Sequence, residues 1–70
     1  MFATAKITVQ GRTRGNAVHY RKCNDFGGIY NLLEPVAGHE AAEDAASWCE
    51  LNPVGAEYDG DGFSIEIVDE

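Results

Sequence analysis

The sequence predicts an α+β domain with the element order ββααββ, in which two helices pack on one face of a four-stranded antiparallel sheet. Three observations predict this fold. Near both ends of the chain, apolar and polar residues alternate with the period of two that is typical of half-buried strands. In the middle of the chain, apolar residues recur at the spacing of one helical face. Glycine-containing turns separate the two strands of each pair, which indicates hairpins. The order of the strands in the sheet stays open.

The N-terminal part of the chain predicts the first hairpin. Apolar and polar residues alternate over residues 3–10 and again over residues 17–22, where Val18 and Tyr20 share one side of the strand. The segment 12–14, Arg-Thr-Arg, lies between glycines that tolerate positive φ. We therefore expect a basic loop at the tip of this hairpin.

A short helix is predicted over residues 26–34. Apolar residues stand at the first, fourth, fifth and eighth positions of this segment, which is the spacing of one helical face. Asp25 is a suitable N-cap because its side chain can accept a hydrogen bond from the first turn. Pro35 biases the residue before it away from helical geometry, so we expect the helix to end there.

A second helix is predicted over residues 39–51. This segment is rich in Ala and Glu, follows Gly38 and ends before Asn52-Pro53. Trp48 is the bulkiest residue on its apolar arc, so we expect it to be the largest buried side chain. The arc consists of Ala41, Ala42, Ala45, Ala46, Trp48 and Cys49.

The C-terminal part of the chain predicts a second hairpin. Residues 54–58 and 63–68 flank the turn 59–62, which contains two Asp-Gly pairs. Oxygen-bearing side chains at alternate positions from Glu57 resemble the start of a calcium loop, but the twelfth position is Val68 instead of Glu. A tight polar turn is the better interpretation, with weak calcium binding as the alternative.

The length and composition predict one small acidic domain spanning residues 1–70. The chain has 70 residues and a net charge of −7. Chains of this size bury only roughly 60% of their unfolded surface, so the core is thin and a partner or a dimer interface would add stability. No apolar run approaches the ~20 residues that cross a bilayer, and the first residues lack the apolar stretch of a signal peptide. We expect a cytoplasmic protein.

The two signs of charge are segregated along the chain. All 5 Lys and Arg residues precede Asn24, and all 12 Asp and Glu residues follow it. An acidic surface repels phosphate backbones and anionic headgroups. We therefore expect no direct nucleic-acid binding and no membrane binding. The remaining interpretations are an acidic face that docks on a basic partner and an acidity that serves only solubility.

The residues that could carry chemistry lack the spacing of known sites. His19, Cys23, His39 and Cys49 do not form the close pairs of a structural zinc site, so we expect no metal and no cofactor. The two cysteines are expected to be free buried thiols, with a disulfide between them as the alternative. The sequence has no nucleophile elbow and no phosphate-binding loop, so we expect no enzymatic activity.

The acidic face of the second helix is the main functional candidate. Glu50 lies near the C-terminal end of that helix, where a negative charge is unfavourable, and has no Lys or Arg one turn away. We expect a small non-enzymatic interaction protein that binds a basic macromolecular partner, such as a phage-type or mobile-element inhibitor that occupies a nucleic-acid-binding surface. The alternative is a structural or assembly module, or a homodimer, whose acidity serves only solubility. The residues expected to contact the partner are Glu40, Glu43, Asp44, Glu50, Asp59 and Asp61.

Overall fold

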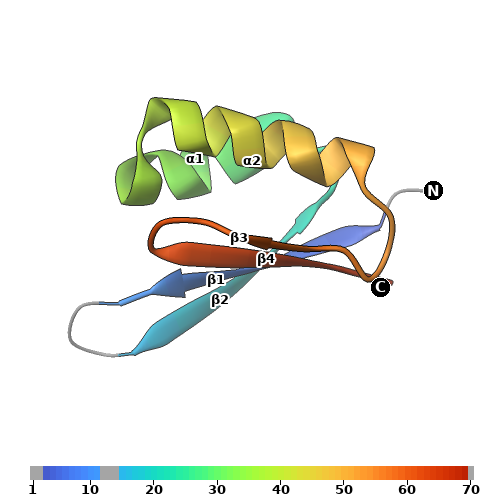
Figure 1. Ribbon diagram of the computed structural model, residues 1–70, viewed down its shortest axis with the longest axis horizontal. Coiled ribbons are helices and arrows are strands. Elements are labelled where there is room, and N and C mark those ends of the chain that lie inside the picture. Colours follow the sequence, from blue (N-terminus) through green and yellow to red (C-terminus); the bar gives the residue numbers. More distant parts are fainter. Residues whose placement is uncertain (1–2, 12–14, 70) are drawn as a thin grey trace.

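The computed structural model describes residues 3–11 and 15–69, and it confirms the α+β fold and the order ββααββ. The two helices form one layer over one face of the sheet (Figure 1). The basic loop predicted at residues 12–14 lies outside the described residues. Within the described residues, neither helix has the length and hydropathy needed to cross a bilayer. The elements are β1 (Thr4–Gln10), β2 (Asn16–Lys22), α1 (Phe26–Ala37), α2 (His39–Leu51), β3 (Glu57–Asp59) and β4 (Phe63–Val68).

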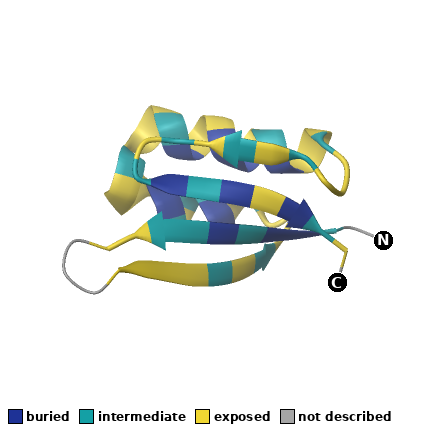
Figure 2. Cartoon of the chain, turned by 60° about the horizontal axis from the view of Figure 1, so that its bottom comes forward, coloured by how far each residue is buried: buried dark blue, intermediate teal, exposed yellow. Residues whose placement is uncertain are grey.

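The sheet has the strand order β2-β1-β4-β3, and every neighbouring pair is antiparallel. The first and last strands of the chain are therefore the two central strands, and the register places Ile7 of β1 opposite Ile65 of β4. Figure 2 shows buried residues concentrated in β1 and β4, whereas the edge strands β2 and β3 are mostly exposed. The core lies between the two central strands and the helices. Its largest fully buried side chains are Ile7, Ile29, Leu33, Ile65, Ile67 and Cys49.

Helix α1 begins where the sequence predicts but does not end at Pro35. The side chain of Asp25 caps its N-terminus, because one carboxylate oxygen accepts a hydrogen bond from the backbone N–H of Gly28 at 3.1 Å. The prediction that Pro35 ends the helix is wrong, since α1 continues to Ala37. Proline removes the bond to the carbonyl four residues earlier, which belongs to the exposed residue Asn31 and can be hydrated instead.

Helix α2 has the predicted bounds, but Trp48 is only half-buried. The expectation that it is the largest buried side chain is therefore wrong. The residues of α2 that are buried against the core are small: Ala42, Ala45, Ala46 and Cys49. Small residues let the helix approach closely, which leaves no space under it for an indole ring. Trp48 instead lies on the flank of α2 and packs on Tyr58 of β3, with ring centroids 5.2 Å apart.

The second hairpin is confirmed with a shorter first strand. Strand β4 has the predicted bounds, whereas β3 covers Glu57–Asp59 and not residues 54–58. The chain turns before β3, because the N–H of Ala56 donates to the carbonyl of Pro53 at 3.1 Å and Gly55 has a φ of 97°. This positive φ is not strand geometry, so regular strand structure starts only at Glu57, although Gly55 and Ala56 already exchange backbone hydrogen bonds with Ile67 of β4.

Candidate interaction surface

The strand order converts the segregation of charge along the sequence into a segregation in space. The described basic residues, Lys6, Arg21 and Lys22, lie on β1 and β2. Strand β3, which carries Glu57 and Asp59, lies at the opposite edge of the sheet from β2. The edge strand β2 is therefore basic and the edge strand β3 acidic, while Lys6 on the central strand β1 lies opposite Glu66 of β4.

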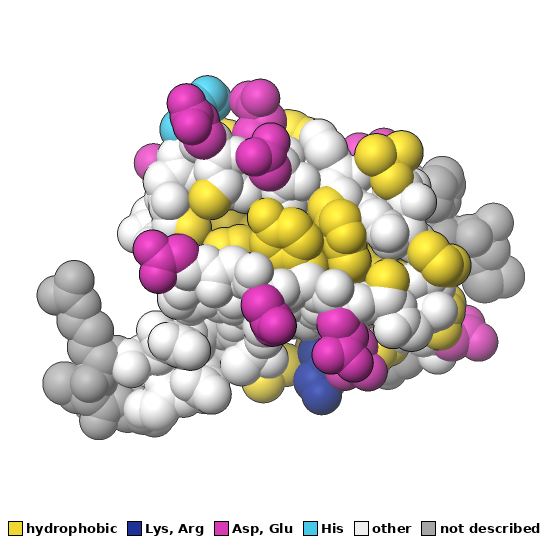
Figure 3. Space-filling view, in the orientation of Figure 1, with side chains coloured by type: hydrophobic (Ala, Val, Ile, Leu, Met, Phe, Trp, Pro, Cys, Tyr) yellow, Lys and Arg dark blue, Asp and Glu magenta, His cyan; other side chains and the backbone are white. Residues whose placement is uncertain are grey.

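The four acidic residues predicted on the second helix are all exposed on α2. They are Glu40, Glu43, Asp44 and Glu50, and we call them the α2 carboxylates. Glu40, Asp44 and Trp48 follow one another at intervals of four residues, so they share the flank of α2 that packs towards β3. Glu43 and Glu50 are seven residues apart and lie on the neighbouring flank. Figure 3 shows acidic side chains gathered over this helix.

A second group of carboxylates follows β3 and the turn after it. Its members are Glu57, Asp59 and Asp61, all exposed, and we call them the β3 carboxylates. Tyr58 points towards the helices and packs on Phe63, so its neighbours on β3 point to the open face of the sheet. Asp59 and Asp61 are predicted from the sequence as contact residues, whereas Glu57 is not. The alternation of acid, tyrosine and acid in β3 is the pattern that could have identified it.

A pair of half-buried aromatic residues, Trp48 and Tyr58, lies between these two groups. We call them the aromatic pair. Figure 3 shows hydrophobic side chains between the acidic side chains over α2 and those along β3. Tyr58 in turn stacks on the buried ring of Phe63, with centroids 5.9 Å apart and ring planes 18° apart. The aromatic pair, the α2 carboxylates and the β3 carboxylates together form the acidic side of the domain.

Few of these carboxylates have a counter-ion. Among the residues that the structure describes, the one ion pair is between Nε2 of His39 and Oε2 of Glu43, at 3.6 Å. No Lys or Arg within the described ranges pairs with a carboxylate of the acidic side. Lys6 lies opposite Glu66 and lines the same surface depression as Glu57 and Asp59, so it offsets part of the negative potential near β3, whereas the α2 carboxylates have no described Lys or Arg in salt-bridge contact.

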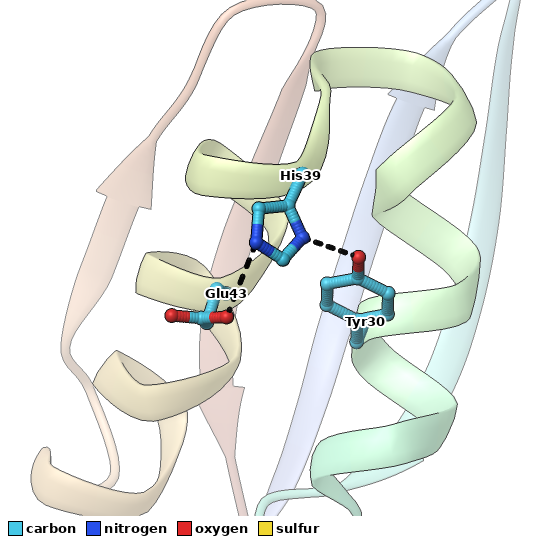
Figure 4. Close-up of polar contacts among 3 residues, drawn as sticks. All are labelled: Tyr30, His39 and Glu43. Carbon is cyan, nitrogen blue, oxygen red and sulfur yellow. Dashed lines mark hydrogen bonds and ion pairs between the residues drawn. The ribbon is translucent and has the colours of Figure 1, made fainter.

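Glu43 takes part in a contact that joins the two helices (Figure 4). The phenol of Tyr30 on α1 and Nδ1 of His39 on α2 are hydrogen-bonded at 2.6 Å, and the other ring nitrogen of His39 faces Glu43. The side chains of His39 and Glu43 are 66% and 56% exposed, so water screens the ion pair and its contribution to stability is small. Glu43 therefore remains exposed, although it is the one α2 carboxylate within salt-bridge distance of another described side chain.

The residues considered for metal binding are not gathered at one place. Within residues 3–11 and 15–69, no three His, Cys, Asp or Glu side chains form a group that could hold a metal ion. Cys23 and Cys49 are free and buried. Burial is the main cause that raises the pKa of the Cys49 thiol to about 12, with smaller contributions from Cys23 and Glu50. At neutral pH this thiol is therefore protonated and unreactive.

Comparison with known proteins gives no further indication of function. The chain matches no protein family model and no curated protein, and no solved structure matches it. Its function is therefore inferred from the chemistry of the acidic side.

Proposed function

We propose that this protein is a non-enzymatic binding module that docks on a basic protein partner through its acidic side. The observation that carries this proposal is the arrangement of the α2 carboxylates and the β3 carboxylates on either side of the aromatic pair. Protein interfaces commonly have an apolar centre enriched in aromatic residues and a polar rim. Among the described residues, no Lys or Arg lies within salt-bridge distance of an acid of this rim.

Each part of the acidic side has a distinct role in this proposal. The carboxylates attract Lys and Arg side chains over several ångströms and raise the rate of association, an effect that salt weakens. The aromatic pair offers apolar area and ring faces, and an Arg or Lys side chain can stack on these faces in a cation–π contact. Trp and Tyr are also the residue types that contribute most to binding in measured interfaces.

The class of partner follows from the sign of the charge. A phosphate backbone would be repelled, whereas a protein surface that itself binds nucleic acid is rich in Lys and Arg. The proposed role is therefore that of an inhibitor that occupies such a surface and blocks access of the nucleic acid. The competing view is that the acidity only maintains solubility, in which case the position of each carboxylate is unimportant.

A titration with a defined cationic probe separates these two views. Trp48 is the single tryptophan of the chain and lies in the acidic side, so its fluorescence reports directly on binding there. The probe is a synthetic peptide of alternating Arg and Leu, titrated at low and at high salt. The variants are Asp44→Lys, Asp59→Lys and the matched control Glu34→Lys, which makes the same charge change at an exposed position on α1.

The proposal predicts that position matters more than net charge. Asp44→Lys and Asp59→Lys should each weaken binding about five-fold, which corresponds to about 1 kcal/mol, while Glu34→Lys should bind nearly as the wild type does. High salt should weaken the wild-type complex strongly. Equal binding by all three variants would show that only net charge counts and would support the solubility view. A pull-down of partner candidates from the native host with the same variants extends the test.

A further inference from the structure

Among the described residues, no strand pairs with the outer edge of β2, so a long edge of the sheet is left unpaired. It has seven residues and forms one edge of the sheet, whereas β3 at the other edge has only three. Exposed edge strands of this length pair readily with another strand unless charges or prolines prevent it. Strand β2 contains no proline, and its two charged residues, Arg21 and Lys22, lie together at its C-terminal end.

The hydrogen bonds of the first hairpin determine which backbone groups of β2 face the free edge. The N–H of Gly11 donates to the carbonyl of Gly15 at 2.8 Å, and the N–H of Cys23 donates to the carbonyl of Ala3 at 3.0 Å. Because hydrogen-bonded and non-hydrogen-bonded pairs alternate in an antiparallel ladder, the odd-numbered residues of β2 bond to β1. The N–H and C=O groups of its even-numbered residues therefore point outward, away from β1, and of these the C=O of Lys22 already accepts a hydrogen bond from the N–H of Asp25 at 2.9 Å. The even-numbered residues are Asn16, Val18, Tyr20 and Lys22.

We infer that two copies of this chain associate through β2, as an antiparallel pair about a two-fold axis that passes between the two copies of His19. In this register every outward-facing residue lies opposite an outward-facing residue of the second copy. Val18 and Tyr20 can exchange both backbone hydrogen bonds with Tyr20 and Val18 of the second copy, whereas Lys22 offers only its N–H because its carbonyl is bonded to Asp25. A shift of one residue would place outward-facing groups opposite inward-facing ones, and a shift of two would leave strand ends unpaired. The pairs are Asn16 with Lys22, Ala17 with Arg21, Val18 with Tyr20, and His19 with itself.

The side chains of β2 fit this register. Val18 and Tyr20 are 47% and 51% exposed on the sheet face that the helices leave open. In the proposed register, Val18 of one copy lies opposite Tyr20 of the second copy, and Tyr20 lies opposite Val18. Pairs of an aromatic and a β-branched residue stabilise antiparallel strands. The four side chains together would cover apolar area that is exposed in the monomer.

The charges of β2 favour the same arrangement. Arg21 and Lys22 fall opposite the uncharged residues Ala17 and Asn16, so no cation faces a cation across the pair. The strand carries no acid, whereas the chain as a whole has a net charge of −7. Association through β2 keeps the acidic sides of the two copies at the outer edges, far from each other. The guanidinium of Arg21 donates to the outward carbonyl of Tyr20 at 2.9 Å, and this exposed bond would be replaced by a backbone N–H of the second copy.

Paired charge variants test both the edge and the register. The Val18→Lys/Tyr20→Lys variant and the Val18→Glu/Tyr20→Glu variant each place like charges opposite one another across the proposed pair. The matched control, Leu51→Lys/Val54→Lys, changes two apolar residues that are 80% and 53% exposed outside β2. Sedimentation velocity over a range of protein concentrations gives the mass, and far-UV circular dichroism confirms that each variant is folded.

The expected result is a wild-type dimer of twice the 7.6 kDa chain mass. Both β2 variants should be monomeric, with a dimer dissociation constant raised at least a hundredfold, and the control should remain dimeric. Mixing the Lys variant with the Glu variant should restore a dimer, because each Lys then faces a Glu. A monomeric wild type, a mixture that stays monomeric, or open-ended polymers formed by β2 with β3 of the next copy would each overturn the inference. Val18 and Tyr20 do not belong to the acidic side, so a failure of this inference leaves the proposed function standing and the two tests are distinguishable.

Discussion

Replacing Gly60 by alanine tests the packing of the second hairpin most directly. Gly60 lies in the turn between β3 and β4, where its N–H donates to the carbonyl of Phe63 at 2.9 Å. A Cβ at this position would overlap the Cζ and Cε1 atoms of the Phe63 ring and lie 2.8 Å from its Cε2. The ring is only 3% exposed and stacks on Tyr58, so it has little space in which to move.

The size of the effect follows from this overlap. Either the buried ring or the turn has to shift, and overpacking of this kind typically costs about 1–3 kcal/mol. We expect Gly60→Ala to lower the free energy of unfolding by about 2 kcal/mol, which for a domain of this size lowers Tm by about 8–16 °C. Because Tyr58 packs on the same ring, the fluorescence of Trp48 should also change.

Urea unfolding followed by circular dichroism measures this loss, and a double variant identifies its cause. The smaller side chain in Phe63→Leu removes the overlap, so Gly60→Ala should cost at least about 1 kcal/mol less in that background than in the wild type. If Gly60→Ala is as stable as the wild type, or if the two substitutions are additive, the ring of Phe63 does not lie over Gly60 and the predicted overlap is refuted.

Three further outcomes are expected from the structure. Gly27→Ala should raise the free energy of unfolding by about 0.5–1 kcal/mol in urea titrations, because the position is helical and no atom lies within 4 Å of the added Cβ. Trp48→Ala should cost about 2 kcal/mol by the same measurement, roughly half the loss for a fully buried tryptophan, because the ring is half-buried. Cys49 should resist an aromatic disulfide reagent at pH 8 until urea unfolds the chain. Its pKa is raised from 9.0 to about 12 by folding, so stability should fall as the pH rises from about 9 towards 12, and Cys49→Ala should lack this component.

The sequence by itself determined the order of the elements, the bounds of α2 and β4 and the exposure of the α2 carboxylates. These features depend on local periodicity and on caps, which are contained in the segment itself. The segregation of Lys and Arg from Asp and Glu along the chain is likewise a property of the sequence alone. The continuation of α1 through Pro35 could not be predicted from the sequence pattern. The free-energy penalty of a proline in a helix depends on whether the carbonyl that loses its hydrogen bond can be hydrated.

Only the tertiary structure decided where the segregated charges lie and which side chains meet. The strand order β2-β1-β4-β3 depends on pairing between the two ends of the chain, and nothing local specifies which strands become neighbours. That order puts the acidic strand β3 beneath the flank of α2, so that Trp48 meets Tyr58. It also leaves β2 at the opposite edge with its even-numbered backbone groups unpaired within the sheet. Both surfaces arise from contacts between residues far apart in sequence, which is why neither the aromatic pair nor the β2 edge could be identified from the pattern of residues alone.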